Sequence, residues 1–108
     1  RDFTYIDDIA AGTILAMKKL GFEIMNLGGG KNPISINQMI AMLEDQLSAK
    51  AIIKYVDANE ADMTETWADI SKAKSLLGWE PKTSLKEGLE HSISHYMKNR
   101  SFYNSVEL

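Results

Sequence analysis

One run of residues, Gly-Gly-Gly-Lys at positions 28–31, has types and spacing that could bind phosphate. A phosphate-binding loop also needs a glycine five positions before its last glycine and a Ser or Thr after the lysine, so that amides, ammonium and hydroxyl converge on phosphate and magnesium. Met25 and Asn32 occupy those two positions. The dinucleotide pattern Gly-x-Gly-x-x-Gly also fails. The run therefore predicts a flexible strand-to-helix loop, and its proximity to a ligand stays open.

Glu87, His91 and His95 are spaced one helical turn apart, as metal ligands on a helix can be. The apolar residues of the same predicted helix lie on the opposite side. The stretch between the two histidines also lacks the glutamate of a zinc-protease helix. We expect a solvated polar face here and no metal-binding residue.

Residues for covalent or hydride-transfer catalysis are missing from the sequence. It has no cysteine, no Gly-x-Ser-x-Gly nucleophile turn, and no tyrosine followed by lysine four positions later. A lysine at that distance would lower the pKa of a tyrosine base beside a nicotinamide. The chain therefore contains no predicted catalytic or cofactor-binding residue.

Composition narrows the class of protein. The 108 residues include 12 Lys and Arg against 15 Asp and Glu, a formal net charge of −3. Scattered basic residues in an acidic chain argue against nucleic acid as a partner, and the apolar runs fall far short of the roughly 20 residues that span a bilayer. The lack of cysteine excludes a disulfide scaffold and favours a reducing compartment. We expect one domain, located in the cytoplasm.

Apolar periodicity and capping residues predict an α/β order of elements, with about three short strands and four helices. The expected strands are one near 3–6 and two over 22–27 and 51–56, and an exposed acidic loop follows over 57–65. Two longer helices are expected in the first half, one over 7–20 capped by Asp7 or Asp8 and one from the Ser35–Gln38 capping box to about residue 48. A short helix capped by Asp69 and ending at Gly78 is expected next, and then a helix over 85–98 opened by the Ser84–Glu87 capping box.

The helical wheel also predicts which faces are buried. For the first helix the buried stripe is Ile9, Ala10, Ile14, Met17 and Leu20, and for the last it is Leu85, Leu89, Ile93 and Tyr96. Three strands are fewer than the roughly 4–6 of a typical sheet, and the sequence opens at Arg1, without Met, inside a predicted strand. We therefore expect a piece of a longer polypeptide.

Several stretches together point to a known family. They are residues 1–10 (Arg-Asp-Phe-Thr-Tyr-Ile-Asp-Asp-Ile-Ala), 24–28 (Ile-Met-Asn-Leu-Gly), 67–74, 76–85 and 87–89. In this order they resemble the C-terminal lobe of extended short-chain dehydrogenases/reductases of the NAD-dependent epimerase/dehydratase family. Ala-Asp-Ile-Ser-Lys-Ala and Pro-Lys-Thr-Ser-Leu are usual in its UDP-glucuronate 4-epimerase branch, and this chain contains both.

The resemblance implies a small C-terminal subdomain over 1–98 that binds a UDP-sugar, followed by a flexible tail over 99–108. The parent enzyme would hold NAD on an N-terminal Rossmann domain, whose glycine-rich turn and Tyr-x-x-x-Lys this chain lacks. Hydride would pass from sugar C4 to NAD and return to the other face of the 4-keto sugar, interconverting UDP-glucuronate and UDP-galacturonate. The chain alone would then be inactive.

Three substrate-binding residues are implied by the same resemblance. Arg1 matches the arginine that contacts the substrate diphosphate, a role that suits a planar guanidinium. Asp62 matches the aspartate that accepts hydrogen bonds from the ribose hydroxyls, and Asn59 stands where relatives carry Arg or Gln towards the phosphates. Glu60 and Ala61 replace the usual Pro-Gly, which leaves the geometry of this loop open.

Alternatives remain open at this point. Within the family, the substrate could be UDP-glucose or a UDP-N-acetylhexosamine, or the reaction a nucleotide-sugar 4,6-dehydration. From another class, the chain could be a stand-alone binding or dimerisation module without catalysis. The resemblance further implies that the parent enzyme is a homodimer. The expectation that neither nucleic acid nor membrane is a partner comes from the acidic composition and the short apolar runs.

Overall fold

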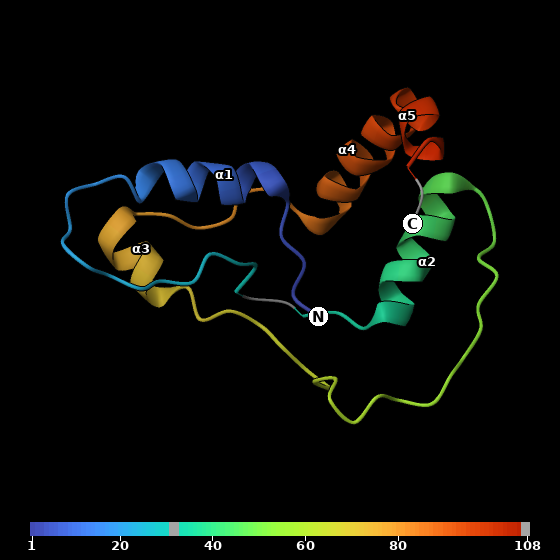
Figure 1. The fold of residues 1–108 in the computed structure, drawn as a ribbon, viewed down its shortest axis with the longest axis horizontal. Helices are drawn as coiled ribbons and strands as arrows, with labels where there is room; N and C mark the ends of the chain where they lie inside the picture. Colours follow the sequence, from blue (N-terminus) through green and yellow to red (C-terminus); the bar gives the residue numbers. More distant parts are fainter. Residues whose placement is uncertain (31–32, 107–108) are drawn as a thin grey trace.

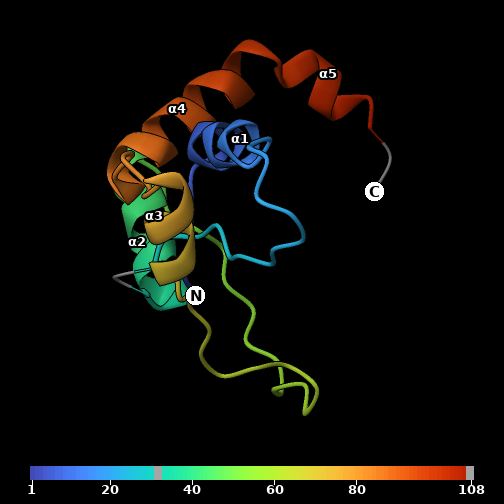
Figure 2. The same ribbon diagram turned by 90° about the vertical axis from the view of Figure 1, so that its left-hand side faces the viewer.

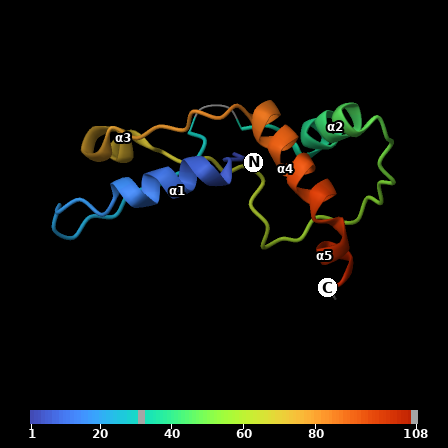
Figure 3. The same ribbon diagram turned by 90° about the horizontal axis from the view of Figure 1, so that it is seen from above.

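The computed structural model describes residues 1–30 and 33–106. The helices in these ranges are α1 (Ile6–Leu15), α2 (Ile36–Leu47), α3 (Ser71–Leu77), α4 (Leu85–Lys98) and α5 (Arg100–Asn104). α1 packs against α3, while α4 contacts both α2 and α5 (Figure 1). Seen from above, these two groups of helices lie at opposite ends of the long axis (Figure 3). No helix in the described ranges is both long enough and apolar enough to cross a membrane.

The predicted α/β class is wrong, because none of the described residues lies in a strand. The segments 3–5, 22–27 and 51–56 have no helical or strand assignment, and Ile52 is completely exposed. A long stretch of chain between α2 and α3 projects away from the helices (Figure 2). β-propensity measures how well a side chain fits a pleated, half-buried surface. These apolar segments have that composition, but no described segment pairs with them.

α1 is shorter than predicted and buries a different face. It ends at Leu15, and Ile14 and Met17 from the predicted stripe are 68% and 85% exposed. The buried residues of α1 are Asp8 and Gly12. A Cβ at Gly12 would lie 2.8 Å from the indole nitrogen of Trp79. Because the large Trp79 ring packs closely against Gly12, α1 buries the face that carries this small residue. Its apolar face, which includes Ile14, is left exposed.

The core is small and centred on α3. Its buried apolar residues are Ile70, Ala73, Leu77 and Trp79, and partly buried residues of the 20–27 segment pack against them. The Trp79 indole nitrogen donates a hydrogen bond to the Asp8 carbonyl at 2.9 Å. The Asp8 carboxylate in turn accepts from the backbone amides of Lys82 and Thr83 at 3.2 and 2.9 Å. Asp8 thereby fastens the start of α1 to the loop that leads into α4.

The other predicted helices are confirmed. The Ser35–Gln38 and Ser84–Glu87 capping boxes open α2 and α4, and α3 ends at Gly78, which has a positive φ of 67°. Ile70 rather than Asp69 is the N-cap of α3, although the Asp69 carboxylate still accepts from the Ser71 amide at 2.9 Å. α5 forms within the predicted tail, where no periodicity indicated a helix. Residues 107–108 of that tail lie outside the described ranges.

Candidate functional site

Arg1 and Asp62, two of the three predicted site residues, are in direct contact. The Arg1 guanidinium pairs through Nη2 with the Asp62 carboxylate, and its Nη1 donates to the Met63 carbonyl. The Arg1 side chain is 30% exposed and that of Asp62 is 67% exposed. The ion pair thus lies at the surface, where solvent screens it and a ligand can reach both partners.

Asn59 shapes the turn that carries Asp62. Its backbone carbonyl accepts from the Asp62 amide at 2.9 Å, and its side-chain oxygen accepts from the Ala61 amide at 3.0 Å. Side-chain oxygens of asparagine often stabilise turns in this way. The side-chain oxygen is therefore already used within the loop, and a role of Asn59 towards phosphate stays a prediction.

One cavity of about 290 Å³ is lined by Arg1, Asn59 and Asp62 together, with Ser35, Ile36 and Thr64 among its other residues. It therefore combines a guanidinium, which can hold phosphate oxygens in pairs, with a carboxylate that can accept from hydroxyl groups. α2 begins at Ile36, so the positive end of its dipole also lies at this cavity. This combination suits an anion that carries hydroxyl groups.

The backbone of Arg1 is held beside the start of α2. The Arg1 nitrogen donates to the Ile34 carbonyl at 2.7 Å, and the Ile34 amide donates to the Arg1 carbonyl at 2.9 Å. The sequence signal at Ser35 predicted the helix but gave no indication that the helix begins next to Arg1, because that proximity arises from tertiary contacts.

The glycine run is closely packed rather than flexible. A Cβ at Gly28 would lie 2.6 Å from the Cβ of Ala68, and one at Gly29 would overlap the Asp2 carboxylate. Gly30 has a positive φ of 71°, and its amide donates to Asp2 at 2.7 Å. These glycines thus allow close approach of backbone and side chains. Lys31 and Asn32, which entered the phosphate-loop analysis, lie outside the described residues.

The residues of the possible metal ladder on α4 have separate partners. The His91 ring lies 5.4 Å from that of Tyr5, and the His95 ring lies 6.2 Å from that of Tyr103. The Glu87 carboxylate accepts from the amide and hydroxyl of Ser84 at 2.9 and 2.6 Å. The described part of the chain holds no group of three or more potential metal ligands.

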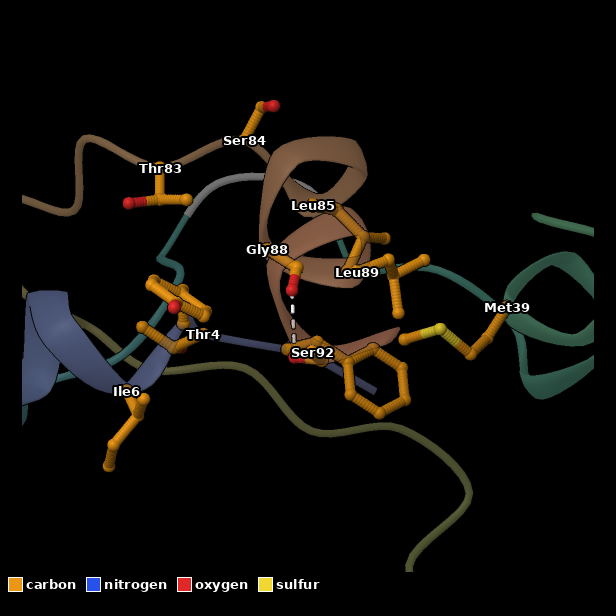
Figure 4. Close-up of a pocket in the computed structure, with 11 residues that line it drawn as sticks. Thr4, Ile6, Met39, Thr83, Ser84, Leu85, Gly88, Leu89 and Ser92 are labelled. Carbon is orange, nitrogen blue, oxygen red and sulfur yellow. Dashed lines mark hydrogen bonds between the residues drawn. The ribbon is translucent and has the colours of Figure 1, made fainter. Parts of the chain in front are cut away.

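A second cavity, of about 250 Å³, lies where the segment before α1 meets α4 and α2 (Figure 4). Apolar groups such as Met39 and Leu89 line it, together with hydroxyl side chains. The Ser92 hydroxyl donates to the Gly88 carbonyl at 2.7 Å. Of the described residues that line this cavity, none is charged. It is therefore a poorer match for a phosphate group than the cavity at Arg1.

Comparisons with known proteins agree with the predicted kinship. Over all 108 residues the chain is 55% identical to a UDP-glucuronate 4-epimerase of Thermodesulfobacterium geofontis, and it covers 33% of that protein. The solved UDP-glucuronic acid 4-epimerase of Bacillus cereus, in complex with UDP-glucuronic acid and NAD, is 40% identical with a TM-score of 0.81, over 91% of this chain and 32% of that one.

The epimerase Mth375 of Methanothermobacter thermautotrophicus matches the whole chain and 33% of its own, with a TM-score of 0.89 and 27% identity. The chain thus spans about a third of the length of these relatives. A model of the family described as GDP-mannose 4,6 dehydratase matches residues 1–92. Since that match takes in most of the 108 residues, the chain belongs to this family of nucleotide-sugar epimerases and dehydratases.

Proposed function

We propose that this chain is the substrate-binding part of an NAD-dependent UDP-sugar 4-epimerase that interconverts UDP-glucuronate and UDP-galacturonate. The observation that carries the proposal is the cavity that joins Arg1, Asn59 and Asp62. The proposal is further supported by the 55% identity to a UDP-glucuronate 4-epimerase over the whole chain. Because the chain spans about a third of that relative, the activity is assigned to the complete protein and the chain alone is expected to be inactive.

Arg1 is proposed to hold the diphosphate of the substrate and Asp62 the ribose hydroxyls. Exposed ion pairs contribute only about 0.2–1 kcal/mol, so a diphosphate can displace Asp62 from the guanidinium at little cost. The released carboxylate is then free to accept from the hydroxyls of the adjoining ribose. In the free protein the same ion pair keeps both groups close to their binding positions, which reduces the entropy lost when the substrate binds.

The described glycine run at 28–30 does not fit the pyrophosphate of NAD. The glycines at 28–30 are packed against Asp2, Ala68 and Ile70, and the Gly30 amide already donates to Asp2. The proposal therefore places NAD on the part of the complete protein outside this chain. The contribution of this chain is positional, because a nucleotide held at Arg1 and Asp62 fixes where the sugar lies.

The proposal is tested by incubating the complete gene product with NAD and a panel of UDP-sugars. We expect conversion of UDP-glucuronate to UDP-galacturonate, followed by chromatography, at a kcat/KM at least about tenfold above that for UDP-glucose, a difference of roughly 1.4 kcal/mol in transition-state binding. Faster turnover of UDP-glucose or a UDP-N-acetylhexosamine, or loss of water to a 4-keto-6-deoxy sugar, would replace this reaction with one of the alternatives. Absence of turnover with every sugar would favour a non-catalytic binding or dimerisation module.

Two further parts of the proposal concern the setting of the protein. We propose a homodimer, with no nucleic acid or membrane as partner, in line with the acidic composition. We also propose a cytoplasmic location, which the lack of cysteine favours. Light scattering of the complete gene product and fractionation of the cells that produce it test these two points separately.

A further inference from the structure

We infer that Asp2 is the positioning residue for the Arg1 guanidinium. This inference rests on the proposed function and adds to the proposed site a residue that does not line the cavity at Arg1. One oxygen of the Asp2 carboxylate, Oδ2, accepts two backbone hydrogen bonds, from the Gly30 amide at 2.7 Å and from the Ala68 amide at 3.2 Å. Asp2 thus joins two segments that lie far apart in the sequence, one at Gly30 and the other at Ala68.

Both of these segments also hold Arg1. The first continues to Ile34, which exchanges two backbone hydrogen bonds with Arg1. The second is preceded by Asp62 and Met63, which accept from the guanidinium. Asp2 therefore joins these two segments at Gly30 and Ala68, and the same two segments contact Arg1. The 51–65 stretch is exposed throughout, so few contacts hold it in place. The hydrogen bond from the Ala68 amide to Asp2 is therefore an anchor for the segment that carries Asp62.

The residues around the Asp2 carboxylate leave a space that fits this group closely. A Cβ at Gly29 would overlap Oδ1, so only glycine leaves room for the carboxylate at this position. The Ala68 methyl packs against Gly28 on the neighbouring side. Hydrogen bonds from backbone amides to a carboxylate are charge-assisted and stronger than neutral ones. Asp2 is therefore held in one place, and the adjoining Arg1 with it.

Asp8 is a matched control for this role. Its carboxylate also accepts two backbone hydrogen bonds, from the loop before α4, and Asp8 is buried whereas Asp2 is partly buried. It stabilises the other end of the fold, around Trp79. Loss of either carboxylate should lower the melting temperature, but only loss of Asp2 should weaken the binding of a diphosphate at Arg1.

The experiment is a double-mutant cycle on the complete gene product, with UDP and NAD titrated by calorimetry. We expect Asp2→Ala to raise the Kd for UDP about tenfold, as loss of one strong interaction would, and to leave the Kd for NAD unchanged within about twofold. In an Arg1→Ala background, Asp2→Ala should raise the Kd for UDP by less than about twofold, because coupled residues are not additive. Asp8→Ala should lower the melting temperature without changing the UDP affinity.

Two more variants keep the inference testable if Asp2→Ala does not fold. Gly29→Ala displaces the carboxylate without removing it and should weaken UDP binding in the same way. Asp2→Asn retains an acceptor oxygen and should bind UDP within about threefold of the unaltered protein, since the proposed role requires hydrogen-bond acceptance.

The outcomes separate the inference from the proposed function. If Arg1→Ala leaves the Kd for UDP unchanged, the proposed site is wrong and the inference falls with it. If Arg1→Ala weakens binding but Asp2→Ala and Gly29→Ala do no more than Asp8→Ala, the inference alone is overturned. An Asp2→Ala effect of the same size in both backgrounds would also overturn it, because Asp2 would then act independently of Arg1.

Discussion

The guanidinium of Arg1 pairs with the carboxylate of Asp62, a residue 61 positions further along the chain. The pair borders a cavity of about 290 Å³ at the beginning of α2. A diphosphate and a ribose are adjacent in a nucleotide, so the proposed site places next to one another two groups that suit these two parts of the ligand. The two side chains neutralise one another across this contact, and we propose that each binds a separate part of the nucleotide.

Asp62→Ala should remove recognition of the ribose. A hydrogen bond to a charged group is worth roughly 1.5–3 kcal/mol, so we expect the Kd for UDP in the complete gene product to rise about tenfold or more. The unaltered protein should also prefer UDP to 2′-deoxy-UDP, and the variant should lose this preference. A preference of unchanged size in Asp62→Ala would show that another residue contacts the ribose.

Asp8 should make the stability of the protein sensitive to acid. Burial alone raises the pKa of the Asp8 carboxyl, but hydrogen bonds from the Thr83 and Lys82 amides outweigh burial and hold this pKa below its ordinary value of 3.8. A lowered pKa in the folded state means that the stabilisation is present above the unfolded pKa and is lost as the pH falls towards the folded one.

This pH dependence is measured from melting temperatures of the unaltered protein and Asp8→Asn. At pH 7 we expect the variant to melt roughly 2–8 °C lower. The difference should shrink below about pH 4, as the Asp8 carboxyl of the unaltered protein becomes protonated. A difference that stays constant down to pH 2.5 would contradict the role given to the ionised Asp8.

Gly12→Ala should destabilise the protein even though alanine favours helices by about 1 kcal/mol over glycine. The added Cβ would lie 2.8 Å from the Trp79 indole nitrogen and 2.9 Å from Leu27, so the core must shift to admit it. Overpacking of this kind costs roughly 1–3 kcal/mol. The control is Ser94→Ala on the exposed part of α4. An increased melting temperature for Gly12→Ala would show that the contact with Trp79 is loose.

Local signals in the sequence predicted the helices well. The capping boxes at Ser35 and Ser84 and the glycine at 78 are short-range features, and α2, α3 and α4 begin or end at them. The strands were predicted wrongly because the apolar content of 22–27 and 51–56 indicates only a preference, whereas a strand requires a partner. The buried face of α1 was missed because it depends on how Trp79 approaches Gly12.

The residues of the candidate site could not be predicted from local sequence signals. No spacing relates Arg1 to Asp62 across 61 residues, and these two residues were identified through the family resemblance. Their contact in the structure is an independent observation that brings the two together. No local sequence signal indicates the role of Asp2, because its two amide partners, Gly30 and Ala68, become neighbours only in the folded chain.

The central claim, that Arg1 anchors the nucleotide of the substrate, is tested most directly by titrating UDP and NAD into the complete gene product and its Arg1→Ala variant. We predict that the variant binds UDP at least about tenfold more weakly, as expected when a charge-assisted contact is lost, and that its Kd for NAD stays within about twofold. Equal losses for both ligands, or an unchanged Kd for UDP, would contradict the claim.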